Sequence, residues 1–350
     1  MSSTPETVLD TLSMFEAAYS LPEQVAAAAE QFATPIIGLP RPDSIEHVVV
    51  LGMGGSGISG DVVAAVAGPV SSVPIIVSKE YELPGFVGPN TLVFAVSFSG
   101  NTEETLEAAT EAVHNGAHLV ALSAGGKLAE LAAQWDAVHL ALPSEIVMPR
   151  AALGALTVPL LLALEQMGLA SGATGDIAAA VAQLRRRRDA LRQPGNEAER
   201  LARRIGRTIP LVYSGGPIGA VAAQRWKSEF NENAKVPAWA NRVPELCHNE
   251  AAGWGQHGDV TRQVFTLLFL RHDHEHPQIA RRYVLLRELM TEVVAGIVEV
   301  KAEGDGLLAQ LMDLALLGGL VSLHVAADAG VDPGPIPALE FIKDLSLIHI

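Results

Sequence analysis

The chain has 350 residues, which is enough for one large or two medium domains with a sizeable core. Its formal net charge of -15 argues against a nucleic-acid-binding groove, and it means that an anionic ligand must be held by local donors. The single cysteine, Cys247, excludes an intramolecular disulfide and a cysteine zinc cluster, and it fits a reducing cytoplasm.

The first part of the chain shows a helical pattern, and residues 1–40 are predicted to form a helical N-terminal extension. Residues 1–21 lack the basic and apolar segments of a signal peptide. The longest apolar stretch, 151–164, contains Pro159 and is too short to cross a bilayer. We therefore expect a cytoplasmic protein without a membrane segment.

Short apolar runs then alternate with helical patterns, which is typical of a parallel, doubly wound sheet. The first run leads into a glycine-rich loop and a helix, and the third leads into a predicted helix at 103–114. The strands predicted in this half are 47–51, 74–77, 92–96, 118–122 and 137–140.

Residues 151–192 break this rhythm and are predicted to be mostly helical. They carry four consecutive arginines, 185–188, which would suit a phosphate or a nucleic acid. Consecutive positions fan around a helix, however, and three acidic residues lie nearby to balance the arginines: Asp176, Asp189 and Glu197. We interpret the run as structural, and residues 193–196 as a linker.

The α/β pattern restarts after this linker. A strand at 209–213, a second glycine loop at 214–219 and a helix at 220–230 repeat the opening of the first half. Further strands are predicted at 264–270 and 297–300, and further helices at 278–294 and 307–327. The predicted fold class is α/β, with two doubly wound subdomains whose parallel sheets are flanked by helices. Their predicted extents are 41–195 and 196–345, and residues 346–350 are predicted to be a non-native tail.

The first chemical motif is the glycine loop 52–57, between a strand and a helix. Glycines let backbone N–H groups approach an anion closely, and the helix N-terminus adds partial positive charge. Gly52, Gly54 and Gly57 also match the dinucleotide fingerprint, and Glu80 lies near the place expected for a ribose-binding acid. This loop alone leaves both interpretations open.

The second motif, 97–102, follows the predicted strand 92–96 and opens a helix. Ser97, Ser99 and Thr102 offer three hydroxyls, and the first turn of the helix offers unpaired N–H groups, which together suit a phosphate monoester. The alternative is that Ser99 or Asn101 only caps the helix. A cap explains one of these residues, so the motif favours a phosphate site.

Several motifs in this order resemble the bifunctional phosphoglucose/phosphomannose isomerase family, whose members contain sugar isomerase (SIS) domains. The resemblance covers about residues 40–345. The motifs that carry it are GMGGSG (52–57), SFSGNTEET (97–105), Met148-Pro149-Arg150, FNENAK (230–235) and Cys247-His248-Asn249-Glu250.

This resemblance implies two SIS subdomains, a homodimer with an active site built across it, and a sugar phosphate substrate. It implies that Glu232 is the catalytic base, His248 the ring-opening residue, Arg150 a charge stabiliser and Lys343 a C-terminal lysine at the site. The residues expected to hold the phosphate are Gly55, Ser56, Ser97, Ser99 and Thr102.

The types of these residues agree with such chemistry. Moving a proton between C1 and C2 of a sugar needs one carboxylate that reaches both carbons of a planar enediolate, which suits Glu232 unless it is an ordinary surface glutamate. Ring opening needs a group that exchanges a proton near neutral pH, which suits His248, and Asn249 and Glu250 stand beside it to orient it.

Three features leave alternatives open. Arg150 suits an enediolate oxygen, a phosphate or an ion pair with Glu145. The family often has threonine in the proline-rich approach to Lys343, where this chain has Gly334, so the use of mannose 6-phosphate is open. Residues 272–276 (HDHEH) carry metal-ligand types, but we expect them to splay into solvent before Pro277.

The sequence therefore predicts an aldose–ketose isomerase without a metal or cofactor, which interconverts glucose 6-phosphate and fructose 6-phosphate through a cis-enediolate. Two alternatives remain: a non-catalytic SIS module that senses a sugar phosphate, and an NAD-dependent enzyme. A sensor would not require Glu232 and His248.

Overall fold

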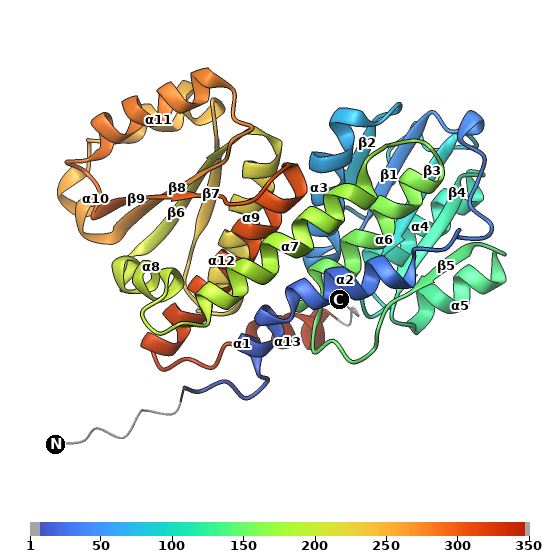
Figure 1. Ribbon diagram of the computed structural model, residues 1–350, viewed down its shortest axis with the longest axis horizontal. Helices are drawn as coiled ribbons and strands as arrows, with labels where there is room; N and C mark the ends of the chain where they lie inside the picture. Colours follow the sequence, from blue (N-terminus) through green and yellow to red (C-terminus); the bar gives the residue numbers. More distant parts are fainter. Residues whose placement is uncertain (1–7, 347–350) are drawn as a thin grey trace. The chain divides into compact units, whose positions relative to one another are not determined.

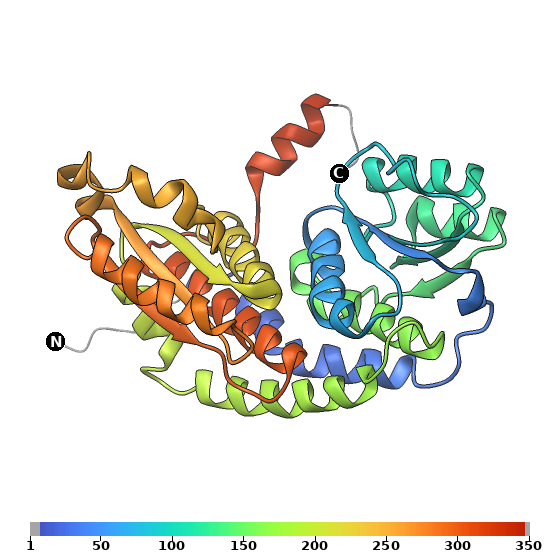
Figure 2. The same ribbon diagram turned by 90° about the horizontal axis from the view of Figure 1, so that it is seen from above.

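The computed structural model describes residues 8–346, and its chain divides into two compact units. The first-sheet unit comprises Ser20–Val181 and the C-terminal residues from Pro337 on. The second-sheet unit comprises the residues up to Tyr19 and Ala182–Ile336. Each unit is built around one parallel sheet with helices on both faces (Figures 1 and 2). The boundaries predicted at 40, 195 and 345 stay a prediction, and the predicted tail 346–350 lies, apart from the backbone of Ser346, outside the described residues.

The first sheet has the strand order β2-β1-β3-β4-β5, and all neighbouring strands are parallel. All six residues of β3 are buried, as expected for a central strand covered on both faces. The strands are β1 (His47–Leu51), β2 (Ile75–Ser78), β3 (Thr91–Val96), β4 (His118–Ser123) and β5 (Val138–Ala141).

Alternate residues of the strands face opposite layers of helices. Val49, Leu51, Val93 and Ala95 pack against α4 and α5, whereas Val50 faces α3. Each fully buried Val or Leu side chain contributes roughly 1.5–3 kcal/mol to folding. The helices of this unit are α2 (Leu21–Gln31), α3 (Gly54–Ala67), α4 (Glu103–His114), α5 (Gly126–Gln134), α6 (Leu153–Gln166) and α13 (Pro337–Ser346), with 3-10 turns η1 (Pro42–Ser44), η2 (Gly68–Val70) and η3 (Pro149–Ala151).

The second sheet has the order β7-β6-β8-β9 and is also parallel throughout. Its strands are β6 (Ile209–Gly215), β7 (Trp239–Val243), β8 (Phe265–Arg271) and β9 (Gly296–Lys301). Its helices are α1 (Met14–Tyr19), α8 (Glu197–Ile205), α9 (Gly216–Glu232), α10 (Gly258–Val264), α11 (Pro277–Met290) and α12 (Leu307–Asp328), with 3-10 turns η4 (Glu245–His248) and η5 (Glu250–Gly253). Helix α7 (Ala173–Leu191) contains the boundary between the two units.

The two faces of this sheet are covered by different segments. Leu211, Tyr213 and Phe269 point to α11 and to the segment that follows β7. Helix α9 packs on β6 and β7 and in turn contacts α12. Helix α9 connects β6 to β7, and α11 connects β8 to β9, so the two connections run in opposite directions across the sheet. Because such crossovers are right-handed, the two helices lie on opposite faces (Figure 1).

The predicted fold class is confirmed, with differences in detail. The strand β7 was missed in the sequence, because Asn241 and Arg242 interrupt a short run that begins with the exposed Trp239. The predicted second glycine loop is wrong in extent: β6 continues through Gly215, and α9 begins at Gly216. Helix α11 ends at Met290, four residues before the predicted end.

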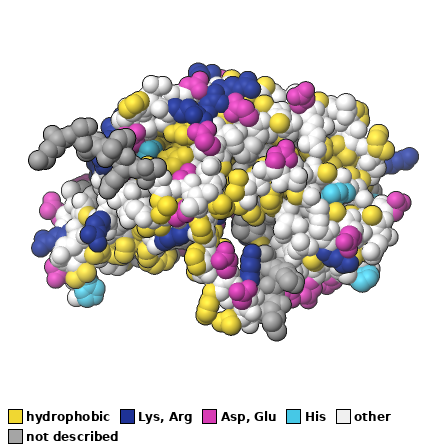
Figure 3. Space-filling model, turned by 90° about the horizontal axis from the view of Figure 1, so that it is seen from below, with side chains coloured by type: hydrophobic (Ala, Val, Ile, Leu, Met, Phe, Trp, Pro, Cys, Tyr) yellow, Lys and Arg dark blue, Asp and Glu magenta, His cyan; other side chains and the backbone are white. Residues whose placement is uncertain are grey.

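Helix α12 is long and apolar enough to cross a membrane, but 94% of its most apolar window is buried inside the protein, as in a core helix. The arginine run is largely structural, as predicted, with Arg188 paired to Asp189 at 2.9 Å and Arg187 to Glu197 at 3.0 Å. The sequence did not show that Arg187 is buried, where it also meets Asp313 at 3.2 Å. On the face drawn in Figure 3, Lys and Arg side chains lie beside Asp and Glu side chains.

Candidate active site

Two loops meet at the carboxyl edge of the first sheet. Strands β1 and β3 are neighbours, and the sheet is built outward from them in opposite directions, so they form its topological switch point. Open α/β sheets bind ligands at this place. The loop that opens α3 follows β1, and the loop that opens α4 follows β3. The N-termini of these two helices therefore lie at the same edge of the sheet, where first-turn N–H groups are suited to bind an anion.

The first loop packs against the segment that carries Arg150. A Cβ atom at Gly55 would lie 2.9 Å from the carbonyl carbon and oxygen of Pro149 and 3.2 Å from the backbone nitrogen of Arg150. Only glycine permits this approach. Arg150 itself is 7% exposed, so its guanidinium is held within the protein. The structure thus brings Gly55, Ser56 and Arg150 together.

The second loop is organised around the hydroxyl of Ser97, which is fully buried. Its Oγ accepts hydrogen bonds from the backbone N–H groups of Gly100 at 3.1 Å and Thr102 at 3.4 Å. It also lies 2.8 Å from Thr102 Oγ1. Ser56 Oγ accepts from the N–H of Phe98 at 3.1 Å, which links the two loops. Four of the five predicted phosphate-binding residues therefore lie together: Gly55, Ser56, Ser97 and Thr102.

The fifth, Ser99, is exposed, and its Oγ accepts from the N–H of Asn101 at 3.2 Å. Neither Ser99 nor Asn101 is the N-cap of α4. Thr102 occupies that position, and its side chain makes no capping bond. Asn101 instead accepts from the N–H of Lys127 at 3.0 Å, which joins this loop to the start of α5. The helix-capping alternative thus does not account for the hydroxyls.

A lysine that the sequence analysis missed lies at the same edge. Lys79 directly follows β2, its Cε lies beside Gly57 of the first loop, and its ammonium pairs with Asp61 of α3. Burial raises the pKa of Asp61, and the ion pair with Lys79 opposes this shift. A lysine at the end of a strand next to the glycine loop was the available signal. Glu80, the alternative ribose ligand, is exposed.

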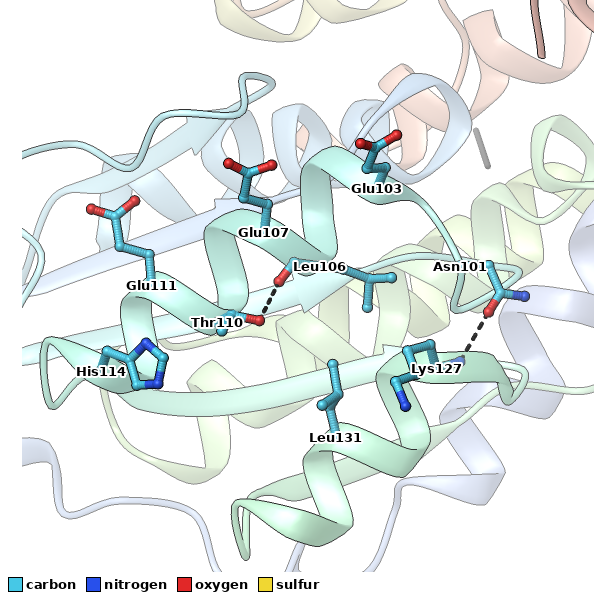
Figure 4. Close-up of a pocket in the computed structure, with 9 residues that line it drawn as sticks. All are labelled: Asn101, Glu103, Leu106, Glu107, Thr110, Glu111, His114, Lys127 and Leu131. Carbon is cyan, nitrogen blue, oxygen red and sulfur yellow. Dashed lines mark hydrogen bonds between the residues drawn. The ribbon is translucent and has the colours of Figure 1, made fainter. Parts of the chain in front are cut away.

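A groove of about 700 Å³ runs between α4 and α5, and Asn101 of the second loop lines it (Figure 4). Asn101 and Lys127 lie at one end of it, and Leu106 and Leu131 lie along its length. One wall carries a row of carboxylates from α4: Glu103, Glu107 and Glu111. These charges would repel a phosphate, so the groove along α4 is a poor place for the anion.

Glu232 is the last residue of α9 and is half-buried. Its backbone carbonyl accepts a hydrogen bond from Lys235 Nζ at 2.5 Å. Helix α9 starts at the carboxyl edge of the second sheet and has 17 residues. At about 1.5 Å per residue it spans roughly 25 Å, so Glu232 lies at the amino edge, near the start of β7.

His248 belongs to the segment that leaves the carboxyl edge after β7, and its side chain is exposed. This segment lies on the α11 face, where Leu246 is fully buried, whereas α9 lies on the other face. Glu232 and His248 are thus separated by the length of the strands and by the sheet itself. The structure does not bring these two residues together within one copy of the unit.

The remaining predicted residue, Lys343, lies half-buried on α13, next to the exposed Ile342. Gly334, in the approach to it, is enclosed by the N-terminal segment. A Cβ atom there would lie 2.8 Å from Leu12 Cγ, so a threonine would require Leu12 to move. In this chain, Leu12 takes the space next to the position where the family often has threonine.

Of the residues 272–276, Asp273, His274 and His276 are exposed, as expected, but His272 is not. His272 is 4% exposed, and its Nε2 donates to the carbonyl of Gly215 at 2.7 Å. Burial lowers the pKa of His272, which keeps the ring neutral. Glu275 pairs with Arg271, and His276 accepts from the N–H of Gln278 to cap α11. Within residues 8–346, no group of three or more such side chains is placed to hold a metal ion.

Comparison with known proteins agrees with this architecture. The SIS domain family matches residues 44–167, and the bacterial phospho-glucose isomerase C-terminal SIS domain matches residues 195–345. The bifunctional phosphoglucose/phosphomannose isomerase of Caldicellulosiruptor bescii is 34% identical over 95% of this chain and 98% of its own length. The chain belongs to this family. The Aquifex aeolicus member is 35% identical over 85% of this chain and 89% of its own.

Solved structures share the fold at lower identity. The C-terminal domain of glucosamine-fructose-6-phosphate aminotransferase from Francisella tularensis superimposes with a TM-score of 0.68 at 14% identity. The match covers 92% of this chain and 97% of that domain. The predicted membership of the phosphoglucose/phosphomannose isomerase family is thus confirmed, and the alternative of a non-catalytic sensor is not favoured.

Proposed function

We propose that this phosphoglucose/phosphomannose isomerase family member interconverts glucose 6-phosphate, and also mannose 6-phosphate, with fructose 6-phosphate through a cis-enediolate. The convergence of two phosphate-type loops at the switch point of the first sheet is the observation that carries this proposal. In a chain with a net charge of -15, such a concentration of N–H and hydroxyl donors implies an anionic ligand.

The phosphate is held by the first-turn N–H groups of α3 and α4 and by the hydroxyls of Ser56, Ser99 and Thr102. Ser97 stabilises the conformation of the second loop through the hydrogen bonds that its Oγ accepts from Gly100 and Thr102. Arg150, held beside Gly55, supplies positive charge to the developing enediolate oxygen. Charge-assisted hydrogen bonds of this kind contribute roughly 1.5–3 kcal/mol each.

Glu232 then moves the proton between C1 and C2, and His248 opens the sugar ring by exchanging a proton with the ring oxygen. Because these residues lie at opposite edges and on opposite faces of one sheet, one copy of the unit cannot present both to one substrate. We propose that the protein is a cytoplasmic homodimer in which each site takes Glu232 from one copy and His248 from the other. Lys343 is proposed to lie at the same site.

Exchange of the C2 proton of glucose 6-phosphate with deuterated solvent, followed by NMR, tests the proposal. The parent protein should exchange this proton, and Glu232→Gln should lower the rate by about 10²–10⁴-fold while KM stays similar, because the amide keeps its shape but cannot act as a base. Glu288→Gln, at an exposed glutamate of α11, is the control. Binding of fructose 6-phosphate without any exchange by the parent would point to a sensor instead.

The reaction is also proposed to need no metal. Prolonged EDTA treatment should leave the isomerase rate unchanged, since His272, Glu275 and His276 are engaged in separate protein contacts. Loss of activity that zinc or manganese restores would contradict this.

A further inference from the structure

The segment that carries His248 is tied to the second sheet by one carboxylate. Glu250 was expected to orient His248, but its side chain points to the sheet. One of its carboxylate oxygens accepts a hydrogen bond from the hydroxyl of Tyr213, and the other accepts from Asn241 Nδ2. Tyr213 lies in β6 and Asn241 in β7, and the two are register partners in the parallel ladder. Their side chains therefore emerge on the same face, and the carboxylate of Glu250 spans them.

The hydrogen bond between Glu250 and Tyr213 is shielded from water, because Tyr213 is buried. Tyr213 is 1% exposed and belongs to the core under α11. Burial, and next the hydrogen bond to Glu250, raise the pKa of Tyr213, so the phenol keeps its proton and remains a donor. A buried phenol that lost its acceptor would be left with an unsatisfied hydroxyl, which is costly. The hydrogen bonds of Glu250 therefore fix the segment after β7 to the second sheet.

His248 stands between two anchors. Before it, Leu246 is fully buried in the same core, and after it, Glu250 is bonded to both strands. Asn249 ties the two sides of His248 together. Its Oδ1 accepts from the N–H of Glu250 at 2.6 Å, and its Nδ2 donates at 2.9 Å to Glu245, the residue before Leu246. His248 itself is exposed, so its place depends on the backbone that these anchors fix.

We propose that Glu250, clamped by Tyr213 and Asn241, is the positioning residue that fixes the backbone of His248 for ring opening. This inference rests on the proposed function of His248. A general acid–base group must lie within hydrogen-bond reach of its proton, and a misplacement of about 1 Å can cost about 100-fold in rate. Loss of the clamp should therefore impair ring opening and leave the proton transfer by Glu232 intact.

The test compares two substrates. Fructose 6-phosphate must be opened, whereas 5-deoxyfructose 6-phosphate lacks the hydroxyl that closes the furanose ring and bypasses this step. Glu250→Ala should lower kcat/KM for fructose 6-phosphate by about 10–100-fold and change that for the analogue by less than about 3-fold. Tyr213→Phe, which removes one donor and keeps the ring, should show the same selectivity with a smaller loss. Glu288→Ala is the control for removing an exposed glutamate.

A double variant separates positioning from general damage. If Glu250 acts through His248, adding Glu250→Ala to His248→Ala should cause no further loss on fructose 6-phosphate beyond about 2-fold. An equal loss on both substrates, or an additive loss in the double variant, would overturn the inference while leaving the role of His248 standing. A His248→Ala variant that did not distinguish the two substrates would overturn the proposed ring-opening role itself, and this inference with it. Should Glu250→Ala fail to fold by circular dichroism, Tyr213→Phe decides.

Discussion

The hydroxyls of the phosphate loop are not equivalent, although the sequence presents them as one group. Ser97 is fully buried and accepts two backbone N–H groups, so it belongs to the framework of the loop. Ser99 is exposed and accepts only one local bond from Asn101 in the same turn. Residue type and spacing identified all three hydroxyls. They could not show which hydroxyl is buried and supports the loop and which is exposed to a ligand, because burial depends on the tertiary structure.

Ser97→Ala should therefore lower the free energy of unfolding by about 1–3 kcal/mol. The N–H of Thr102 loses its acceptor, and the N–H of Gly100 keeps only the backbone carbonyl of Ser97 at 3.0 Å. Ser99→Ala should change it by less than about 0.5 kcal/mol but weaken fructose 6-phosphate binding by about 1.5–3 kcal/mol. Urea denaturation and calorimetric titration measure the two effects. Parental stability in Ser97→Ala, or parental affinity in Ser99→Ala, would contradict this assignment.

The sequence predicted the chemical types of the site residues better than it predicted where their side chains point. The motif around His248 predicted that Glu250 orients the histidine, but the sequence could not show that its carboxylate is bonded to Tyr213 and Asn241. Asn241 lies in the strand that was missed, so the sequence could not place a donor there. Lys79 was passed over for a similar reason, because only the structure shows its side chain beside the first loop.

At the scale of elements, the phosphate loop and the start of α5 are in close backbone contact. Gly100 has φ 72°, a left-handed conformation, and a Cβ atom there would lie 1.8 Å from the carbonyl oxygen of Gly125. The loop can therefore pass the start of α5 only if residue 100 lacks a side chain.

Gly100→Ala should lower the free energy of unfolding by at least about 2 kcal/mol, from backbone strain and from the displaced loop. It should also weaken phosphate binding, since the N–H groups of the loop would shift. Gly85→Ala is the matched control, because nothing lies near its Cβ position, and it should cost less than about 0.5 kcal/mol. Equal stability of the two variants in urea would rule out this packing constraint.

Strand and helix patterns were read correctly where a segment is strongly periodic or uniformly apolar, as in β1, β3 and α12. They failed at β7, where pairing with β6 stabilises a strand of weak propensity. The buried ionic cluster was also beyond the sequence. Arg187 of α7 is far along the chain from Asp313 of α12 and Glu303 after β9, and only the fold brings it to them.

This cluster predicts a pH dependence of stability. Burial raises the pKa of Asp313 to about 6, and the nearby Arg187 opposes the shift. Because the folded value lies above the model value of 3.8, the folded state binds the proton more tightly. The contribution of Asp313 to stability is therefore fully present below about pH 4 and is lost as the pH rises to about 6.

Asp313→Asn removes this titration. Relative to the variant, the parent should lose up to about 3 kcal/mol of unfolding free energy between pH 4 and 6, with no further change above that range. Urea denaturation of both proteins at intervals across this range measures the difference. A gap that stayed constant, or that moved in the parent's favour as the pH rose, would contradict the raised pKa.

At the scale of the whole molecule, proximity in sequence was misleading. Glu232 and His248 are only 16 positions apart (248 minus 232), which suggests neighbours in one site. The intervening chain, however, enters β7 at the amino edge and leaves it at the carboxyl edge, so it carries the second residue across the sheet. The resemblance to the family predicted a site built across a dimer, and the topology of the second sheet gives a physical reason for it.

Mixing two inactive variants tests this arrangement. Glu232→Gln and His248→Ala should each be strongly impaired on fructose 6-phosphate as homodimers, since each site lacks one of its two groups. After subunit exchange of an equal mixture, half of the dimers should contain one copy of each variant. In such a dimer one site receives both intact residues and the other receives neither, so the mixture should recover about one quarter of the parental activity.

The position of the two residues in the fold makes this result specific. If Glu232 and His248 acted from the same copy, every site in the mixed dimer would still lack one group, and no activity would return. A mixture of Glu232→Gln with itself, taken through the same exchange, is the control for recovery caused by handling. Size-exclusion chromatography with light scattering establishes the dimer independently, so that absent complementation in a dimeric protein would count against the shared site and not against the dimer.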